Sequence, residues 1–449
     1  YIISLLGRHD GSSLVAEQNR FRNYYSVSGA WVVSQEEFFR NDILNYFKLR
    51  GSYGVLGNLG NLSPSSVSPL MIQTVAYLED NPSANFGYMQ NDLANPNLRW
   101  ADSKQADFGA DFGFFRNKLT GQFDYFTKKT TNMIFSHGLP GTSGMTGQVF
   151  ENAGLIEDKG IELGLNWTDK FSEDFGYSIY GNLGTLKNKV VELLPGQNEI
   201  QMGNNVRGTL VPSWIKVGDA MYSFYGYKTG GLFQSQEEIN NYKDSSGNLI
   251  LPNAKPGDIK FLRAPGNDGK LDPKKDMVNI GNPYPDFTYS FGLNLNYKNF
   301  DLNAFFQGTQ GNKIFNGLKF MALNPGGAAK NLNMDSSILN AWSPTNTNTN
   351  IPRLAYGDPA GNYSRVSDFY VEDGSYLRLK NFTVGYTIPR NTMDRIGLYT
   401  ARVYVTASNL FTITKYTGMD PEVGMSNLGI DVGRYPQPRA FIFGFTLGI

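Results

Sequence analysis

The sequence predicts an all-β fold, namely a transmembrane antiparallel β-barrel with long extracellular loops. Three observations lead to this prediction. Apolar side chains recur at every second position in many segments, short and long connections alternate between those segments, and the composition combines 14% aromatic residues and 50 glycines with a mean hydropathy of −0.35. Side chains alternate between the two faces of a strand. A barrel wall between lipid and a wet interior requires such an apolar face and such a small or polar face.

Twelve segments show the alternation expected of strands. In the final segment, large apolar residues from Phe441 to Ile449 occupy every second position and therefore share one face. In segment 374–388 the alternation shifts phase at Lys380-Asn381, which predicts a β-bulge. The predicted strands are 1–7, 24–33, 44–55, 103–115, 118–131, 159–169, 175–187, 286–298, 299–311, 374–388, 401–412 and 438–449.

Short and long connections alternate strictly between these strands. The alternation predicts turns at one barrel rim and large loops at the other, with both ends of the chain on the short-turn, periplasmic side. The tight links are 116–117, 170–174 and 298–299, the moderate links are 34–42 and 389–400, and the long loops are 8–23, 56–102, 132–158, 188–285, 312–373 and 413–437.

The connection 188–285 is too long to lack structure of its own. Segments 221–228 and 231–234 predict a hairpin inside it. Ser235, directly before a Gln-Glu-Glu-Ile run, predicts the N-cap of a helix.

Several classes of protein are disfavoured by composition. No stretch approaches the ~18 consecutive apolar residues of a transmembrane helix, so a membrane assignment depends on strands. The net charge of zero gives no support for a nucleic-acid partner. The absence of cysteine excludes disulfides, thiolate metal sites and a cysteine nucleophile. The chain opens within a strand pattern and without a signal peptide, so we expect the natural sequence to continue upstream of Tyr1.

Seven short segments, in this order and spacing, resemble the SusC/RagA-like TonB-dependent outer-membrane transporters over nearly the whole chain. The segments are Lys48–Gly54 with Gly57-Asn58, Asn95–Trp100, Lys159–Leu163, Ser223–Tyr227, Pro256–Lys260, Asp368–Leu379 and Tyr435–Arg439.

The resemblance implies a 22-stranded barrel with a plug domain in its lumen and a SusD-like surface lipoprotein over its mouth. Residues 1–449 would form about the twelve C-terminal strands as a single domain, without the plug, and TonB would be contacted through a missing N-terminal region. The implied function is TonB-dependent import of an oligosaccharide or oligopeptide across the outer membrane of a Gram-negative bacterium, without enzymatic activity, cofactor or metal. The barrel would lie in the lipid bilayer.

The Asn-rich loop 312–373 carries the candidate ligand-binding residues Trp342, Tyr356, Tyr363 and Tyr370. Flat aromatic rings stack on sugars, and amides bond to hydroxyl groups. The alternative, which we favour, is that these rings pack within their own loop or against a partner that covers it.

A calcium loop is suggested by the Asn-Asp-Gly-Lys-Leu-Asp run at 267–272. However, Ala264 and Gly266 stand at the first two ligand positions and offer no side-chain oxygen. An ordinary Asp-Gly turn at Asp268-Gly269 is therefore the favoured interpretation.

Histidine and glycine patterns give little support for an enzyme. His9 and His137 are the only histidines, and no spacing supplies partners for an acid–base or zinc site. Gly54, Gly57 and Gly60 lack the Lys-Ser/Thr and the strand–helix context of a phosphate loop, so a role in turns and close packing is favoured.

Polar and aromatic positions on the predicted strands also have two interpretations. Inward carboxylates are typical either of a hydrolytic pair or of a wet lumen, and we favour the lumen. Aromatic residues near strand ends predict interfacial girdles or simple lipid-facing bulk. The carboxylates are Asp107, Asp111, Asp124, Glu162 and Asp301, and the aromatic residues are Trp31, Tyr125, Trp167 and Tyr297.

Two other classes of protein remain as alternatives. One is a passive pore or a scaffold in an outer-membrane assembly, which would conduct without TonB. The other is a soluble β-rich carbohydrate-binding or hydrolytic protein, in which the apolar faces would be buried against a second sheet.

Overall fold

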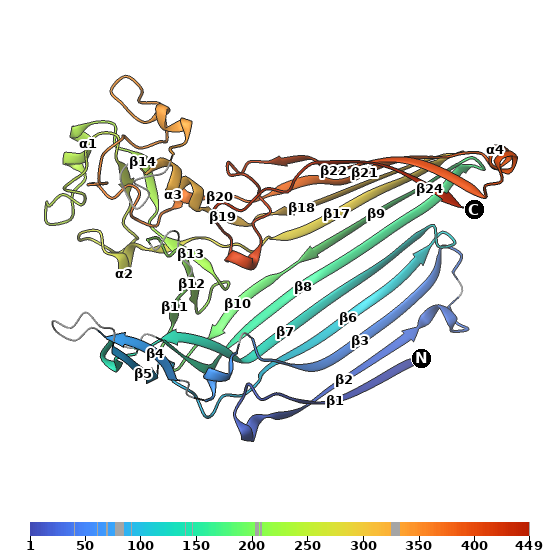
Figure 1. Cartoon of the computed structure of the whole chain (residues 1–449), viewed down its shortest axis with the longest axis horizontal. Coiled ribbons are helices and arrows are strands. Elements are labelled where there is room, and N and C mark those ends of the chain that lie inside the picture. The colour runs from blue at the N-terminus through green and yellow to red at the C-terminus, as the bar shows by residue number, and fades with distance from the viewer. Residues whose placement is uncertain are drawn as a thin grey trace. The chain divides into compact units, whose positions relative to one another are not determined.

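The computed structural model describes residues 1–39, 41–60, 62–68, 71–76, 85–90, 92–139, 141–145, 147–202, 206, 209–324 and 333–448. The predicted final position of the apolar stripe, Ile449, lies outside these residues. Long antiparallel strands dominate the structure (Figure 1). The chain divides into two compact units, which are Tyr1–Gly164 with Lys187–Asn198, and Leu165–Leu186 with Glu199–Ile449.

The first unit is built on one antiparallel sheet in which the strands follow the order β1-β2-β3-β6-β7-β8. A short strand, β10 (Lys187–Glu192), pairs with the first half of β8, and β4 (Met71–Ala76) pairs with β5 (Asn85–Gln90) in a separate hairpin. The strands of the sheet are β1 (Ile2–Gly11), β2 (Phe21–Val32), β3 (Leu44–Asn58), β6 (Ala101–Phe114), β7 (Leu119–Gly138) and β8 (Gln148–Ser172).

The second unit continues from the end of β8 with strands in the order β9-β17-β18-β21-β22-β24. Neighbouring strands from β9 to β24 pair antiparallel. They are β9 (Phe175–Thr185), β17 (Phe287–Tyr297), β18 (Phe300–Gln310), β21 (Tyr376–Thr387), β22 (Thr400–Thr414) and β24 (Ala440–Gly448).

Each of the twelve predicted strands corresponds to one long strand of these sheets. The predicted bulge is also confirmed. On the β18 side, the consecutive residues Phe306 and Phe305 pair with Leu379 and Asn381, so that Lys380 is the extra residue. On the β22 side, Phe411 and Ser408 pair with the same two residues, so that two residues lie opposite Lys380. The bulge restores the alternation, because the apolar residues before and after it then share a face.

The predicted tight turns are confirmed by backbone conformation. Phe115, Arg116 and Asn117 have φ angles of 55°, 58° and 62° between β6 and β7, and Lys298 has a φ of 51° between β17 and β18. Two predicted long loops, 8–23 and 132–158, are shorter than expected, because β1, β2, β7 and β8 extend into them. Backbone pairing continues there, as at Asp10 with Arg22, although the side chains no longer alternate.

The predicted hairpin within 221–234 is wrong. β13 (Ser223–Gly226) pairs with β12 (Ser213–Lys216) and β16 (Val278–Gly281), whereas β14 (Thr229–Leu232) pairs with β15 (Ile259–Phe261). All four residues of β13 are buried, so its backbone groups need strand partners on both edges. The predicted helix is present as α1 (Gln236–Asn241), and the Ser235 hydroxyl accepts from the Glu238 N–H at 3.1 Å.

The remaining elements are short and belong to the loops of the second unit. In the described residues, no helix has the length and apolar character needed to cross a membrane. These elements are β11 (Glu199–Gln201), α2 (Pro273–Asp276), β19 (Lys313–Asn316), α3 (Gly317–Leu323), β20 (Val371–Asp373), α4 (Arg390–Met393) and β23 (Ile430–Asp431).

Candidate functional site

The long strands have one apolar face and one polar face. On the apolar face of β24, Phe441, Phe443 and Phe445 are largely exposed to the surroundings. In register with them on β22 are Ala407, Val405 and Val403. Large exposed apolar side chains recur on this face along the other long strands as well. An apolar face of this extent is typical of a barrel wall that faces lipid.

The polar face of the first unit carries a network of charged residues. The Arg50 guanidinium on β3 forms ion pairs with Asp111 (Nε–Oδ1, 2.9 Å) and with Asp124 (Nη1–Oδ1, 2.6 Å). Lys48 also binds Asp111, at 2.9 Å, and Asp107 lies 3.7 Å from the Arg50 guanidinium. Three of the predicted inward carboxylates are thus joined through one arginine.

A glycine makes this arrangement possible. Gly109 pairs with Arg50 on one side and with Asp124 on the other. A Cβ atom at Gly109 would collide with both the Asp124 carboxylate and the Arg50 guanidinium. The ion pair therefore bridges two strands by lying across the glycine of the strand between them.

The second unit contains a similar ion pair across a glycine. Arg402 on β22 donates to Asp301 on β18 through Nε (2.9 Å) and Nη2 (2.5 Å). The strand between them contributes Gly385, where a Cβ atom would collide with both partners. The bidentate geometry fixes both side chains. Four of the five predicted inward carboxylates form ion pairs. Among the described residues, no ion pair is found for the fifth, Glu162.

Between these charged positions, the polar face of the second unit is neutral. Asn303 donates to Asn294 Oδ1 at 2.6 Å, and Asn294 donates to the Ser178 hydroxyl at 3.0 Å. Tyr180 lies over Gly292 and stacks on Phe305 with ring centroids 6.3 Å apart. Amides, hydroxyls and a flat aromatic pair thus line this surface.

A buried arginine ties the loop after β22 to the strand wall. Arg378 on β21 forms ion pairs of 2.6 Å with Asp420 and with Glu422, and Lys380 binds Glu422 at 2.9 Å. Asp420 also accepts from the backbone N–H of Gln437 at 2.8 Å. Burial alone would raise the pKa of Asp420, but the hydrogen bonds from Arg378 and the backbone outweigh it and hold this pKa below its usual value.

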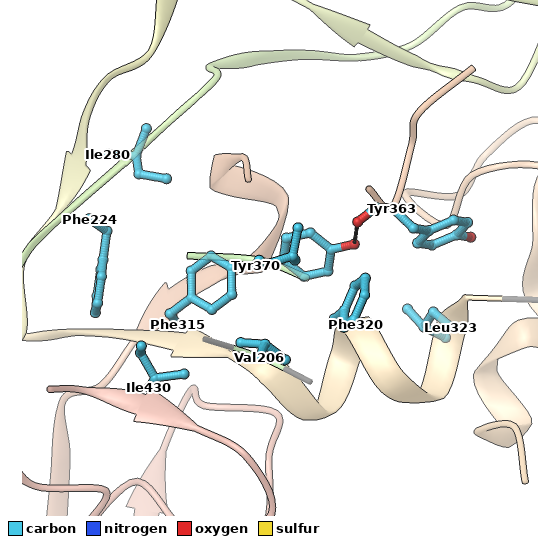
Figure 2. Close-up of a cluster of buried hydrophobic side chains, with 10 residues drawn as sticks. Val206, Phe224, Ile280, Phe315, Phe320, Leu323, Tyr363, Tyr370 and Ile430 are labelled. Atoms are coloured by element: carbon cyan, nitrogen blue, oxygen red, sulfur yellow. Dashed lines mark hydrogen bonds between the residues drawn. The ribbon is translucent and has the colours of Figure 1, made fainter. Parts of the chain in front are cut away.

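The long loops of the second unit form a body with two apolar cores of their own, which we call the loop body. Figure 2 shows the first core, in which Tyr370 packs between Phe315 and Phe320 and its hydroxyl donates to the Tyr363 carbonyl at 3.0 Å. The first core comprises Val206, Leu210, Phe224, Ile280, Phe315, Phe320, Leu323, Tyr363, Tyr370 and Ile430, and the second comprises Tyr227, Leu232, Phe233, Ile239, Ile250, Leu251, Ala254, Ile259 and Phe261.

A buried carboxylate joins the loop 186–286 to the loop 311–375. Asp258 is fully buried, pairs with Arg353 (Nε–Oδ1, 2.8 Å) and accepts from the Asn362 amide at 2.9 Å. The neighbouring Gly257 has a φ of 90° and lies against the Trp342 ring. The Pro256–Lys260 segment quoted above as a resemblance therefore has a structural role, which sequence reasoning did not assign to it.

The four predicted ligand-binding aromatic residues lie in two kinds of environment. Tyr363 and Tyr370 are neighbours inside the first core, and burial raises the pKa of both phenols. Trp342 packs against the second core and donates to Gln234 Oε1 at 3.0 Å. Tyr356 is 83% exposed. Ligand binding by these residues stays a prediction. Of the four rings, that of Tyr356 is the one most accessible to a ligand.

The 267–272 segment closes around a protein carboxylate. Asp276 is buried and accepts from the Asn267 amide (2.7 Å), the Asp272 N–H (2.7 Å) and the Ala264 N–H (2.9 Å). The Asn267 amide also donates to the Lys270 carbonyl at 3.0 Å. An amide nitrogen thus occupies the centre of the loop and bonds to the oxygens around it. Among the described residues, no cluster of three or more His, Cys, Asp or Glu has metal-binding geometry.

His9 contacts two residues of the neighbouring strand β2. His9 Nδ1 lies 2.6 Å from Asn23 Oδ1, and its ring stacks on Phe21. The side chain of His137 lies outside the described part. Of the predicted girdle residues, Tyr297 is exposed and contacts Phe175, which contacts Phe171, all beside the short turns that follow β8 and β17.

Two-faced antiparallel strands, with short turns at one end and a folded loop body at the other, define the class of membrane β-barrels. The TonB dependent receptor-like, beta-barrel family matches residues 2–410, and the chain belongs to this family. It contributes antiparallel strands to such a barrel.

Named relatives and solved structures agree with this assignment. The chain is 37% identical to the TonB-dependent receptor P3 of Formosa agariphila and 28% identical to the TonB-dependent receptor SusC of Bacteroides thetaiotaomicron, covering 100% of this chain and 44% and 42% of those proteins. The structure of the RagAB peptide transporter matches with a TM-score of 0.80 and 25% identity, over 100% of this chain and 46% of that one. The chain thus spans less than half the length of these relatives.

Proposed function

We propose that this chain forms part of the wall and of the extracellular loop body of an outer-membrane importer for oligosaccharides or oligopeptides. The importer would draw energy through TonB and capture its substrate together with a SusD-like surface lipoprotein. The two-faced wall is the observation that carries this proposal, because an apolar outer face and a hydrogen-bonded polar inner face are what a conduit through lipid requires. The relatives named SusC and RagAB support the substrate classes and the lipoprotein partner.

In this proposal the protein moves its substrate without covalent chemistry. The amide and hydroxyl groups of Ser178, Asn294 and Asn303 would face the conduit, and the ion pairs across Gly109 and Gly385 would hold the wall rigid. The loop body would carry the ligand and lipoprotein contacts. Its two apolar cores and the buried Asp258–Arg353 pair support a preformed surface, which reduces the ordering cost of binding.

Growth and transport of a bacterium that carries the full-length gene test this function. We expect deletion of the gene to abolish growth on one class of oligosaccharide or oligopeptide, and deletion of tonB to have the same effect. A surface lipoprotein should co-purify with the full-length protein. A passive pore would instead conduct in planar bilayers and support growth without TonB.

Tyr356 provides a separate test of the ligand site. Tyr356→Ala should weaken substrate binding by the purified complex, whereas Tyr435→Ala, which removes another highly exposed tyrosine, should not. Equal affinity in Tyr356→Ala and in the unaltered protein would remove Tyr356 from the ligand site and leave the transport function standing.

A further inference from the structure

The apolar face of the second unit contains a trough near the short-turn end of β18, β21, β22 and β24. Its volume is about 420 Å³. Short valine side chains, among them Val403 and Val405, form the floor. Aromatic rings stand on both sides, with Phe300 and Tyr386 along one side and Phe443 and Phe445 along the other.

Strand register explains the shape of the trough. Val403 lies between Tyr386 and Phe445, and Val405 lies directly beside Phe443. Phe443 and Phe445 are 78% and 73% exposed, whereas the two valines are 48% and 42% exposed. The Phe300 and Tyr386 rings pack on each other with centroids 4.7 Å apart, which makes that side a continuous ridge. Small β-branched residues between taller rings leave an elongated apolar depression.

Cationic residues lie in the connections at the short-turn end of these strands. Lys298 lies in the turn two residues before Phe300, while Arg390 in α4 and Arg395 in the following 3-10 helix (Asp394–Ile396) connect β21 to β22 (Figure 1). Arg390 pairs with Asp394 at 2.8 Å. Within the part of the chain that the structure describes, no carboxylate lies within 4.0 Å of Lys298 or Arg395. Lys298 Nζ lies 5.6 Å from the centre of the Tyr297 ring, and the Lys298 N–H donates to the Asp174 carbonyl at 2.8 Å.

An apolar trough that leads to a cationic rim matches the chemistry of a phospholipid. The space of one water molecule in the liquid is ~30 Å³, and a methylene group is of similar size, so this volume accepts on the order of a dozen methylene groups. A phosphate at the end of the chain would meet Lys298 and Arg395, for which charge-assisted hydrogen bonds are available.

We propose that this trough binds one anionic glycerophospholipid, with an acyl chain between the aromatic ridges and the phosphate at Lys298 and Arg395. The inference rests on the membrane location in the proposed function, because the short-turn end is then the periplasmic one. The valines and phenylalanines that line the trough lie on the apolar face, whereas the proposed substrate path follows the polar face. The lipid would act as a bound structural partner of this part of the wall.

Native mass spectrometry of the full-length protein, purified in detergent, tests the proposal with two lipids of identical acyl chains. The probes are palmitoyl-oleoyl phosphatidylglycerol and palmitoyl-oleoyl phosphatidylcholine. We expect one tightly held phosphatidylglycerol per chain and at least tenfold weaker binding of phosphatidylcholine. Val405→Phe fills the trough and should weaken phosphatidylglycerol binding at least tenfold. The double variant Lys298→Glu, Arg395→Glu should reduce the preference between the two lipids to less than twofold.

Matched controls separate this site from general lipid contact. Ile179→Phe enlarges an exposed apolar side chain on β9, and Lys170→Glu reverses a charge beside a different short turn. Both should leave phosphatidylglycerol binding unchanged. Heat-modifiable migration in gels verifies that each variant is folded, and the charge variant decides the question if Val405→Phe does not fold.

Three results would overturn the lipid site. The first is unaltered phosphatidylglycerol affinity in folded Val405→Phe or in the charge variant. The second is an equal loss in Ile179→Phe. The third is dissociation of an oligomer by Val405→Phe, which would show that protein occupies the trough. TonB-dependent uptake should persist in all variants, so failure of the lipid site is distinguishable from failure of the transport function.

Discussion

The strand wall and the loop body of the second unit contain the same types of aromatic residue in opposite environments. Phe443 on β24 is largely exposed, whereas Phe224 on β13 is completely buried. In the wall, exposed rings form one face and hydrogen-bonded polar groups form the other. In the loop body, rings from several short strands meet in closed cores (Figure 2).

The difference reflects the medium that surrounds each region. Burial of a phenylalanine side chain away from water contributes about 1.5–3 kcal/mol, and this contribution drives the loop body to close around its rings. In lipid, no such driving force acts between apolar side chains, because the lipid itself is apolar. The wall is therefore held by its backbone ladder and by polar contacts on the inner face.

The largest expected effect comes from truncating one ring in each region. Phe224→Ala should destabilise the loop body by about 3–5 kcal/mol, because it leaves a cavity in a closed core. Phe443→Ala should change the stability of the wall far less. Hydrogen exchange of residues 199–286 in the full-length protein measures the first effect, and heat-modifiable migration measures the second. A similar loss of protection in both variants would contradict the comparison.

A charge placed on either face of β8 tests the facing of the wall. Leu163→Arg should impair barrel assembly, because a cation at the bilayer midplane costs roughly 2–4 kcal/mol. Glu162→Arg should be tolerated, because its side chain lies on the polar face. Yields of folded protein in outer-membrane fractions measure both effects. The assigned facing is wrong if the two variants are equally damaged.

Replacing one glycine on each face of the wall should cause smaller losses of stability. Gly109→Ala should destabilise the wall by about 1–3 kcal/mol, because the new methyl group displaces the Arg50–Asp124 ion pair. Gly29→Ala should have almost no effect, because no atom lies within 4 Å of a Cβ at that position. Urea titration of the reconstituted full-length protein provides the measurement. Equal midpoints for the two variants would argue against a structural role for the bridged glycine.

The smallest effect concerns acid stability of the loop after β22. The pKa of Asp420 is lower in the folded loop than in an unfolded chain, where it is about 3.9. Its stabilising contribution is therefore complete above the unfolded pKa and is lost as the pH falls through the lower, folded pKa. Hydrogen exchange of residues 415–439 should accelerate in that range after correction for intrinsic rates. Asp420→Asn should remove this pH dependence, and an unchanged profile would exclude the carboxylate as its source.

The long strands could be predicted from the sequence because each has two different faces. A period of two identified all twelve strands and the bulge at Lys380. The ends of β7 and β8 were missed because the buried residues there, among them Val149, Ala153 and Ile156 on β8, do not recur at every second position. There the side chains no longer alternate, although the backbone pairing between the strands continues.

The loop body could not be predicted in the same way. A four-residue strand such as β13, buried on both faces, has no alternation to detect. Asp258 binds Arg353 and Asn362, which are 95 and 104 residues away along the chain, and no local pattern links such partners. Burial of Tyr363 and Tyr370 likewise depends on this long-range packing. The Pro256–Lys260 segment was the available signal.

Spin-label scanning along β17 tests the two-faced wall, with single cysteines placed from Tyr289 to Asn296. Residues 1–449 contain no cysteine, and any cysteine elsewhere in the full-length protein is first replaced by serine. With the full-length protein in bilayers, collision with oxygen reports contact with lipid. We expect high oxygen accessibility at Tyr289, Phe291, Leu293 and Leu295, and low accessibility at Ser290, Gly292, Asn294 and Asn296. An oxygen profile without this period of two, or with its maxima on Ser290, Gly292, Asn294 and Asn296, would contradict this expectation.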